Sequence, residues 1–155
     1  MLEPPPLKDQ GVDPSWVSAV REQRWSQAAT LIDALDAKSR AQPEVRYARA
    51  RVAASLGQHQ KALLLLDGLE KPLKLLGDAI ARDRAISQLE IGPYPLAAQY
   101  FARSPEPEDL ISAAIAWQKE GRLDKSRAIL DRLLKKKPAR ENRPLAFEPK
   151  ARALR

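Results

Sequence analysis

Few side chains in this chain have the types and spacing that catalysis requires. His59 is the only histidine and there is no cysteine, which excludes a Cys nucleophile and a thiolate metal site. The acids Glu106, Glu108 and Asp109 lie beside a proline at the start of a predicted helix, where carboxylates favour the positive end of the helix dipole. No second row of acids continues along that face, so the carboxylate pair of a glycosidase is not evident. We therefore expect no catalytic residue, no metal and no cofactor, and predict that the chain is not an enzyme, except as a non-catalytic part of a larger one.

The composition is that of a folded domain. The chain has 155 residues, of which 44% are hydrophobic and 30% are charged, which is typical of one globular domain. No apolar run approaches the roughly 18 residues of a membrane span, and the N-terminus does not have the pattern of a signal peptide. We therefore expect either a cytoplasmic protein or a chain whose targeting segment is missing.

One sequence pattern occurs three times, at residues 56–69, 91–104 and 120–133, and a degenerate copy begins near Gln23. The copies are anchored on Gly57, Gly92 and Gly121, with Gln23 at the equivalent place in the first copy. Five residues after each anchor comes a small residue, and four residues later a larger apolar one. The small positions are Ala28, Ala62, Ala97 and Ser126, and the larger ones are Ile32, Leu66, Phe101 and Leu130. This spacing is helical, so each copy predicts a turn followed by a helix.

A second helical stretch precedes three of these turns. These stretches run from Pro43 to Gly57, from Pro72 to Gly92 and from Pro107 to Gly121, with a proline at the start and a glycine just past the end, as is typical of helix termini. We therefore predict an all-α protein of about seven or eight antiparallel helices. We expect the following positions to be buried: Ala62, Leu66, Ala97, Phe101, Ala114, Trp117 and Leu130.

The pattern of helix, turn and helix resembles the tetratricopeptide repeat, a family of 34-residue helix pairs. The resemblance is best in the last copy, and Arg49 and Arg84 depart from it, because the family has apolar residues there. It implies a right-handed superhelix, a TPR-like α-solenoid, over residues 13–138, with units at about 13–40, 43–70, 72–105 and 107–138. The Pro-rich lead 1–12 and the basic segment 139–155 lie outside it, and residues after Pro144 or Pro149 are expected to start a further helix of an incomplete array.

Residues 24–85 also resemble the helical superhelix that precedes the catalytic domain of bacterial soluble lytic murein transglycosylases. That resemblance implies an accessory domain of a peptidoglycan-cleaving enzyme, located in the bacterial periplasm or cell envelope. The catalytic part of that family is not found in residues 139–155. We keep this as the alternative to a binding scaffold.

The tetratricopeptide resemblance also implies a binding surface, because in that family the concave face is lined by the first helix of each pair. The corresponding residues are Tyr47, Arg51, Ser55, Arg82, Ile86, Leu89, Ile111, Ile115, Gln118 and Lys119. Aromatic, Arg and aliphatic groups together are typical of a contact with a protein or peptide. The alternative is that the arginines merely solvate an open face. Packing is the interpretation that we favour for Trp25, Trp117 and His59. For Trp16 the choice between packing and stacking on a sugar or a base stays open.

The positive charge is concentrated at one end of the chain. The net charge is +7, and residues 122–155 contain 12 Lys or Arg but only four Asp or Glu. A basic patch is predicted at Lys135, Lys136, Lys137, Arg140 and Arg143. Such a patch could attract an anionic cell-wall polymer, whereas nucleic acid is not favoured because neither interleaved aromatics nor a recognised motif is present. The alternative is that these lysines only complement a helix C-terminus.

Overall fold

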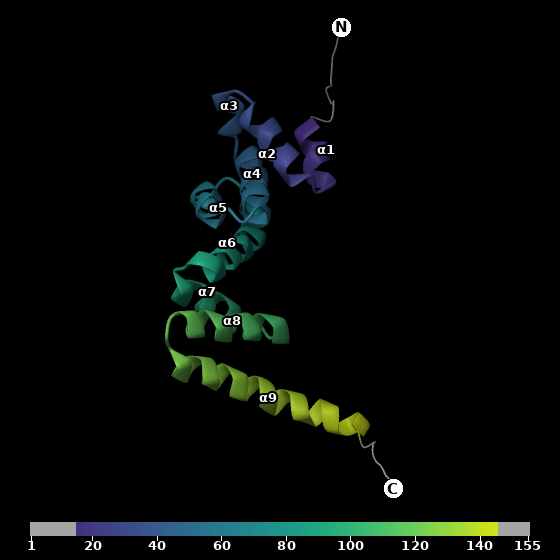
Figure 1. The fold of residues 1–155 in the computed structure, drawn as a ribbon, viewed down its shortest axis with the longest axis vertical. Helices are drawn as coiled ribbons and strands as arrows, with labels where there is room; N and C mark the ends of the chain where they lie inside the picture. Colours follow the sequence, from purple (N-terminus) through teal and green to yellow (C-terminus); the bar gives the residue numbers. More distant parts are fainter. Residues whose placement is uncertain (1–14, 146–155) are drawn as a thin grey trace. The chain divides into compact units, whose positions relative to one another are not determined.

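The computed structural model describes the backbone of residues 15–145 and the side chains of residues 15–135. Within this range the regular structure is entirely helical and contains no strand, which confirms the all-α prediction (Figure 1). The elements are α1 Ser15–Arg21, α2 Trp25–Asp33, α3 Ala37–Arg40, α4 Pro43–Ser55, α5 His59–Leu66, the 3₁₀ helix η2 Lys74–Leu76, α6 Gly77–Ile91, α7 Tyr94–Ala102, α8 Pro107–Lys119 and α9 Leu123–Leu145. The short α3 and the 3₁₀ helix η2 are the elements that the sequence pattern did not predict. The lead 1–12 and the residues after Leu145 lie outside the described part of the chain.

The chain divides into two compact units, one ending at Ile91 and the other beginning at Gly92. The first unit contains α1 to α6 and the second contains α7 to α9. In the described part of the chain, no helix is long and apolar enough to cross a membrane.

The anchor residue of each of the four turns predicted from the repeat has a positive φ. Gly57, Gly92 and Gly121 have φ of 79°, 91° and 86°, and Gln23 adopts φ of 60° at the equivalent position. In three of the turns the next N–H donates to the carbonyl five residues earlier, the hydrogen bond of a Schellman cap: Arg24 to Ala19, Gln58 to Ala53 and Arg122 to Trp117, each at 2.8 Å. The degenerate first copy is therefore a true structural repeat of the other turns.

The helix after each turn begins two residues past the anchor and buries its small residue. These helices start at Trp25, His59, Tyr94 and Leu123. The small residues Ala28, Ala62, Ala97 and Ser126 are at most 2% exposed, and Ile32, Leu66 and Phe101 are buried as well. Ala114 and Trp117 are also buried, as predicted.

Leu130 was predicted to be buried, and it is only half-buried. The buried residue in this turn of α9 is Ile129, at 6% exposure. The main packing partner of α9 is α8, so α9 is covered on the side of Ser126 and Ile129, and Leu130 lies at the margin of that contact. The helix also runs to Leu145, beyond Pro138, where the last repeat unit was expected to end.

The first helices of the pairs begin as their sequences predict in two of three cases. α4 starts at Pro43 and α8 at Pro107, and acidic residues follow in the first turn of both. Glu106 is the N-cap residue of α8, although its side chain makes no capping hydrogen bond. α6 begins at Gly77, five residues later than expected from Pro72. The reason is that Leu73 has a non-helical backbone and packs on the core between α4, α5 and α6, so a 3₁₀ turn precedes the helix.

Each unit has its own apolar core. In the first unit one cluster joins α1, α2 and α4 around Ala19, Ile32 and Val52, with Trp16 and Trp25 packed against it, and a second joins α4 to α6 around Leu66 and Ile80. In the second unit α8 lies between α7 and α9 (Figure 1) and buries Leu110 and Trp117. These contacts confirm the packing roles predicted for Trp25 and Trp117, and Trp16 packs as well.

Candidate functional site

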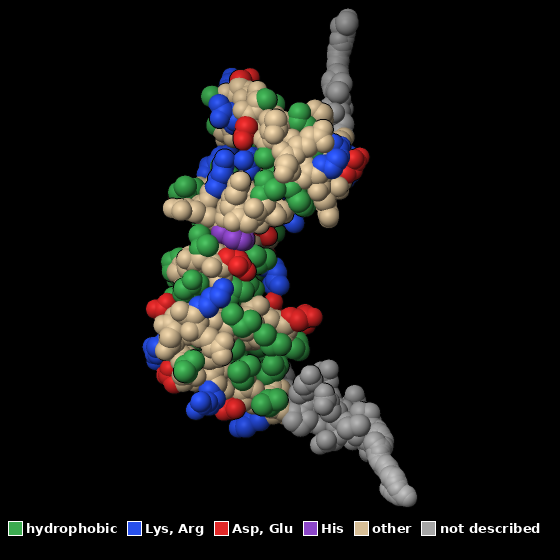
Figure 2. Space-filling view, in the orientation of Figure 1, with side chains coloured by type: hydrophobic (Ala, Val, Ile, Leu, Met, Phe, Trp, Pro, Cys, Tyr) green, Lys and Arg blue, Asp and Glu red, His purple; other side chains and the backbone are tan. Residues whose placement is uncertain are grey.

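The residues predicted to bind a partner are accessible and fall into two groups. Tyr47, Arg51 and Ser55 lie on α4 and Arg82, Ile86 and Leu89 lie on α6, two helices of the first unit that are in contact. Ile111, Ile115, Gln118 and Lys119 lie on the exposed side of α8 in the second unit. Figure 2 shows hydrophobic side chains at the surface of this second unit, where Ile111 is 42% and Ile115 39% exposed. The two groups are described separately because they belong to different units.

Three residues of the first group line a cavity of about 230 Å³ between α4, α5 and α6, which we call the α4–α6 groove. It is lined by Ala50, Arg51, Ala54, Ser55, His59, Leu66, Asp83 and Ile86. Three of the residues predicted from sequence, Arg51, Ser55 and Ile86, therefore come together around one hollow. Small residues of α4 and the buried Leu66 form its apolar part.

A polar cluster fixes the rim of this groove. The hydroxyl of Tyr47 donates to Asp83 Oδ2 at 2.6 Å, and Arg51 Nε lies 3.9 Å from the same oxygen. Burial, followed by the hydrogen bond to Asp83, raises the pKa of Tyr47 to about 12. The Asp83 side chain is 24% exposed and that of Arg51 is 60% exposed. The carboxylate is therefore held by tyrosine, and most of the Arg51 side chain stays accessible to a partner.

His59 and Asp83 are groove residues that sequence reasoning did not select. His59 Nδ1 lies 3.1 Å from Ser87 Oγ, so this half-buried histidine has a polar contact in addition to its packing role. Asp83 adjoins Arg82, which the repeat register selected instead. Tyr47 and Arg51 lie one turn apart on α4. A search of the sequence for opposite charges on the first helices of successive pairs would have matched Arg51 with Asp83.

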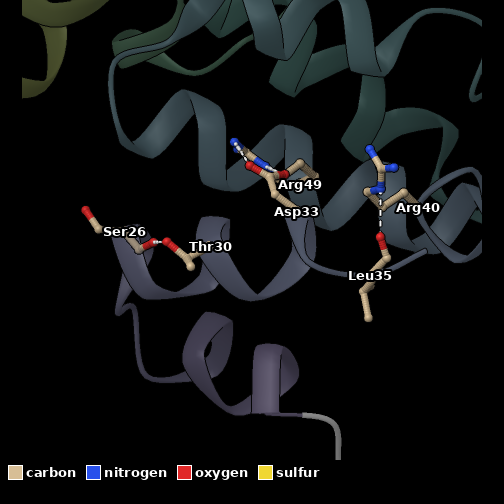
Figure 3. Close-up of polar contacts among 6 residues, drawn as sticks. All are labelled: Ser26, Thr30, Asp33, Leu35, Arg40 and Arg49. Carbon is tan, nitrogen blue, oxygen red and sulfur yellow. Dashed lines mark hydrogen bonds and ion pairs between the residues drawn. The ribbon is translucent and has the colours of Figure 1, made fainter. Parts of the chain in front are cut away.

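The two arginines that depart from the tetratricopeptide pattern each pair with an acid earlier in the chain. Arg49 is 6% exposed and donates from Nε and Nη2 to the Asp33 carboxylate of α2, at 2.9 and 3.2 Å (Figure 3). Arg84 pairs with Glu70 and donates from Nη2 to the Leu66 carbonyl at 3.0 Å. These hydrogen bonds lower the pKa of both carboxyl groups below their ordinary values. Bidentate pairing satisfies most donors of a guanidinium placed where an apolar side chain was expected.

The predicted basic patch lies mostly outside the described side chains. Lys135 is exposed on α9, whereas the side chains of Lys136, Lys137, Arg140 and Arg143 are not among those described. Across the residues that the structure describes, no three His, Asp or Glu side chains are grouped as a metal site requires.

Comparison of the chain with protein-family models, curated protein sequences and solved structures found no match. The likeness to tetratricopeptide repeats therefore rests on the residues, the turns and the helix pairs described above.

Proposed function

We propose that this protein is a non-catalytic module that binds a protein or peptide partner, with the α4–α6 groove as a contact site. The observation that carries the proposal is the position of Arg51, largely exposed beside the Tyr47–Asp83 hydrogen bond and next to the apolar side of the groove. Tyr and Arg are the residues most often enriched at the energetic centres of protein interfaces.

The groove fits a peptide better than a small-molecule ligand. Its volume of about 230 Å³ lies below the roughly 300–1,000 Å³ of small-molecule pockets. It can take one apolar side chain against Ile86 and Leu66. An acidic residue of the same segment would then pair with the exposed face of Arg51. We therefore propose a ligand segment with one acidic and one aliphatic residue close together.

The larger architecture is part of the same proposal. We propose that the helix pairs belong to a right-handed, TPR-like superhelix in which the exposed side of α8, with Ile111 and Ile115, offers a further contact. A role as the helical accessory domain of a lytic transglycosylase in the cell envelope stays a prediction from sequence, since no observation on the described residues favours it.

The proposal can be tested by selecting peptides from a random display library on the full chain. We expect the selected peptides to share an acidic and an aliphatic position. Arg51→Glu should weaken their binding by about tenfold or more, because it replaces an attractive charge with a repulsive one. Ile86→Asp should weaken it similarly by placing a charge in the apolar part of the groove.

The matched control is Arg127→Glu, the same charge reversal at an exposed position on α9. Circular dichroism should show that all three variants keep their helix content. If selected peptides bind Arg51→Glu and Ile86→Asp as tightly as the unmodified chain, the groove is not the binding site.

A further inference from the structure

A second cavity in the first unit has a composition different from that of the groove. It has a volume of about 310 Å³ and is lined by Ile32, Ala37, Arg40, Ala41, Arg46, Arg49 and Leu65, and we call it the arginine pocket. Three of its seven lining residues are arginines and none is a carboxylate. In Figure 2, Lys and Arg side chains gather between α3 and α5.

Arg49 is the most buried of the three arginines, and part of its guanidinium has no partner. Its Nε and Nη2 are used by Asp33, but Nη1 is buried and makes no hydrogen bond. A buried donor left unpaired costs free energy unless a ligand or water accepts from it. Arg49 lines the cavity, so a small movement of its side chain would present Nη1 to an acceptor bound there.

The other two arginines are held in place by backbone carbonyls. Arg40 donates from Nε to the Leu35 carbonyl at 2.9 Å (Figure 3), and Arg46 donates from Nη2 to the Leu65 carbonyl, also at 2.9 Å. Each bond orients the guanidinium and uses only one of its nitrogens. The remaining donors of both arginines are thus prepositioned at low entropic cost.

The three lining arginines and Asp33, the ion-pair partner of Arg49, together carry a net charge of +2. Asp33 offsets Arg49, which leaves Arg40 and Arg46 as the uncompensated cations of the lining. The basic surroundings also act on Asp33, whose pKa is lowered first by the hydrogen bond from Arg49 and further by the charges of Lys61 and Arg40. Two further acids are close to the arginines. Asp36 caps α3, where it accepts from Ser39 N at 2.7 Å and interacts with the charge of Arg40, and Arg46 Nη2 also donates to the Asp67 carbonyl at 3.2 Å.

We propose that the arginine pocket binds the phosphate group of a small organic phosphate monoester. Such a group carries close to two negative charges at neutral pH and three strong acceptor oxygens, which match the two cations Arg40 and Arg46 of the lining and their remaining donors. A carboxylate has one charge and two oxygens, and a single arginine fork would satisfy it. The apolar residues Ile32, Ala37, Ala41 and Leu65 would contact the organic part, and the volume is at the lower end of the range for small-molecule sites.

The test is calorimetric titration of the full chain with butyl phosphate at low ionic strength, with pentanoate as the carboxylate comparator. We expect saturable one-to-one binding of butyl phosphate and much weaker binding of pentanoate. Arg40→Gln should weaken phosphate binding by about tenfold, since it removes one charge-assisted contact at an exposed residue. Ala41→Leu should also abolish most of the binding, because it fills the cavity without changing any charge.

Lys38→Gln on the same short helix is the matched control, because it removes one exposed cation that does not line the pocket. Its affinity should stay within about twofold of the unmodified chain, in line with a weak exposed charge. Amide resonances of Ala37, Ala41 and Leu65 should shift on titration. The proposal is overturned if butyl phosphate shows no saturable binding, if pentanoate binds as tightly, or if Lys38→Gln weakens binding as much as Arg40→Gln.

Discussion

Single residues in this protein can be compared with the residues at the same position in the other repeat copies. A residue that differs from the others can therefore be judged against them. Gln23 adopts the positive φ that three glycines adopt elsewhere, and Ser126 occupies a buried position that is alanine in the other copies. Gln23 and Ser126 should each stabilise the fold less than the residue found at the same position in the other copies. Each can therefore be replaced by the residue that the other copies use.

Gln23→Gly should stabilise the protein. A side chain with a Cβ is strained in the left-handed region, and glycine removes that strain at a smaller cost in unfolded-chain entropy, so we expect a gain of about 0.5–1 kcal/mol in the free energy of unfolding. Urea denaturation followed by circular dichroism would measure it. The converse change, Gly57→Ala, should destabilise by a similar amount, because a Cβ there meets no atom within 4 Å and the cost is backbone strain alone. A loss of stability in Gln23→Gly would contradict this account of the turn.

Ser126→Ala should also stabilise the protein. The Ser126 hydroxyl is buried and makes no hydrogen bond, and removing an unsatisfied buried polar group is worth about 1–3 kcal/mol. Thermal or urea unfolding of the variant should show the gain. Ser26→Ala, at an exposed position of α2, reports the helix-propensity part of the change alone. Equal effects of the two substitutions would show that the Ser126 hydroxyl is not a buried, unsatisfied group in solution.

The Arg49–Asp33 and Arg84–Glu70 pairs predict how stability depends on acid. The arginine hydrogen bonds lower the pKa of Asp33 and Glu70 from ordinary values of 3.8 and 4.5. A lowered native pKa contributes stability above the ordinary value, and this contribution is lost as pH falls through the native value. The free energy of unfolding should therefore decrease from about pH 5 towards pH 2.

Asp33→Asn isolates one of these pairs. At pH 7 we expect a loss of about 1 kcal/mol, the low end for a charged hydrogen bond, because the Asp33 side chain is half-exposed. The difference from the unmodified chain should shrink as pH falls and Asp33 becomes protonated. A difference that stays constant down to pH 2 would mean that the Asp33 charge does not contribute.

At the scale of helices, the repeat predicts which side of a helix is buried, and the neighbouring helix decides how completely. Leu66 on α5 is 1% exposed because it packs in the core with Ala50, Leu69 and Ile80. Leu130, its equivalent on α9, is only half-buried because α8 is the main contact of that helix. One sequence position therefore has two environments.

These two leucines give a matched comparison. Leu66→Ala should lower the free energy of unfolding by about 2–5 kcal/mol, as is usual for a fully buried leucine. Leu130→Ala should cost about 1 kcal/mol, since part of the side chain already contacts water. Denaturant unfolding of both variants tests the assignment. Equal losses would show that Leu130 is fully buried in solution.

At the scale of the whole molecule, positive charge is unevenly distributed between the two units. The first unit contains the groove and the arginine pocket, whereas the excess of Lys and Arg lies in residues 122–155 of the second. An anionic polymer such as a cell-wall component would therefore be expected to bind the second unit. This expectation is independent of the peptide groove.

Replacing Lys135, Lys136 and Lys137 by Gln tests the basic end. Gln has a helix propensity similar to that of Lys, so helix content should stay unchanged. If the basic end binds an anionic polymer such as polyglutamate, the variant should bind more weakly at low salt, and the difference should vanish at high salt because screening is stronger. Co-sedimentation at several salt concentrations would measure this. Equal binding at low salt would show that these lysines are not a docking site.

The sequence by itself determined the local elements. Its repeated glycine and proline positions mark turns and helix starts, and its 3.6-residue periodicity selects Ala62, Leu66 and Phe101 for burial, because these depend on backbone conformation and on residues a few positions apart. The tertiary structure decided which side chains meet across helices. The pairing of Tyr47 with Asp83, the grouping of Arg40, Arg46 and Arg49 around one cavity and the partial burial of Leu130 all depend on contacts between helices, and such contacts leave no periodic signal in a single sequence.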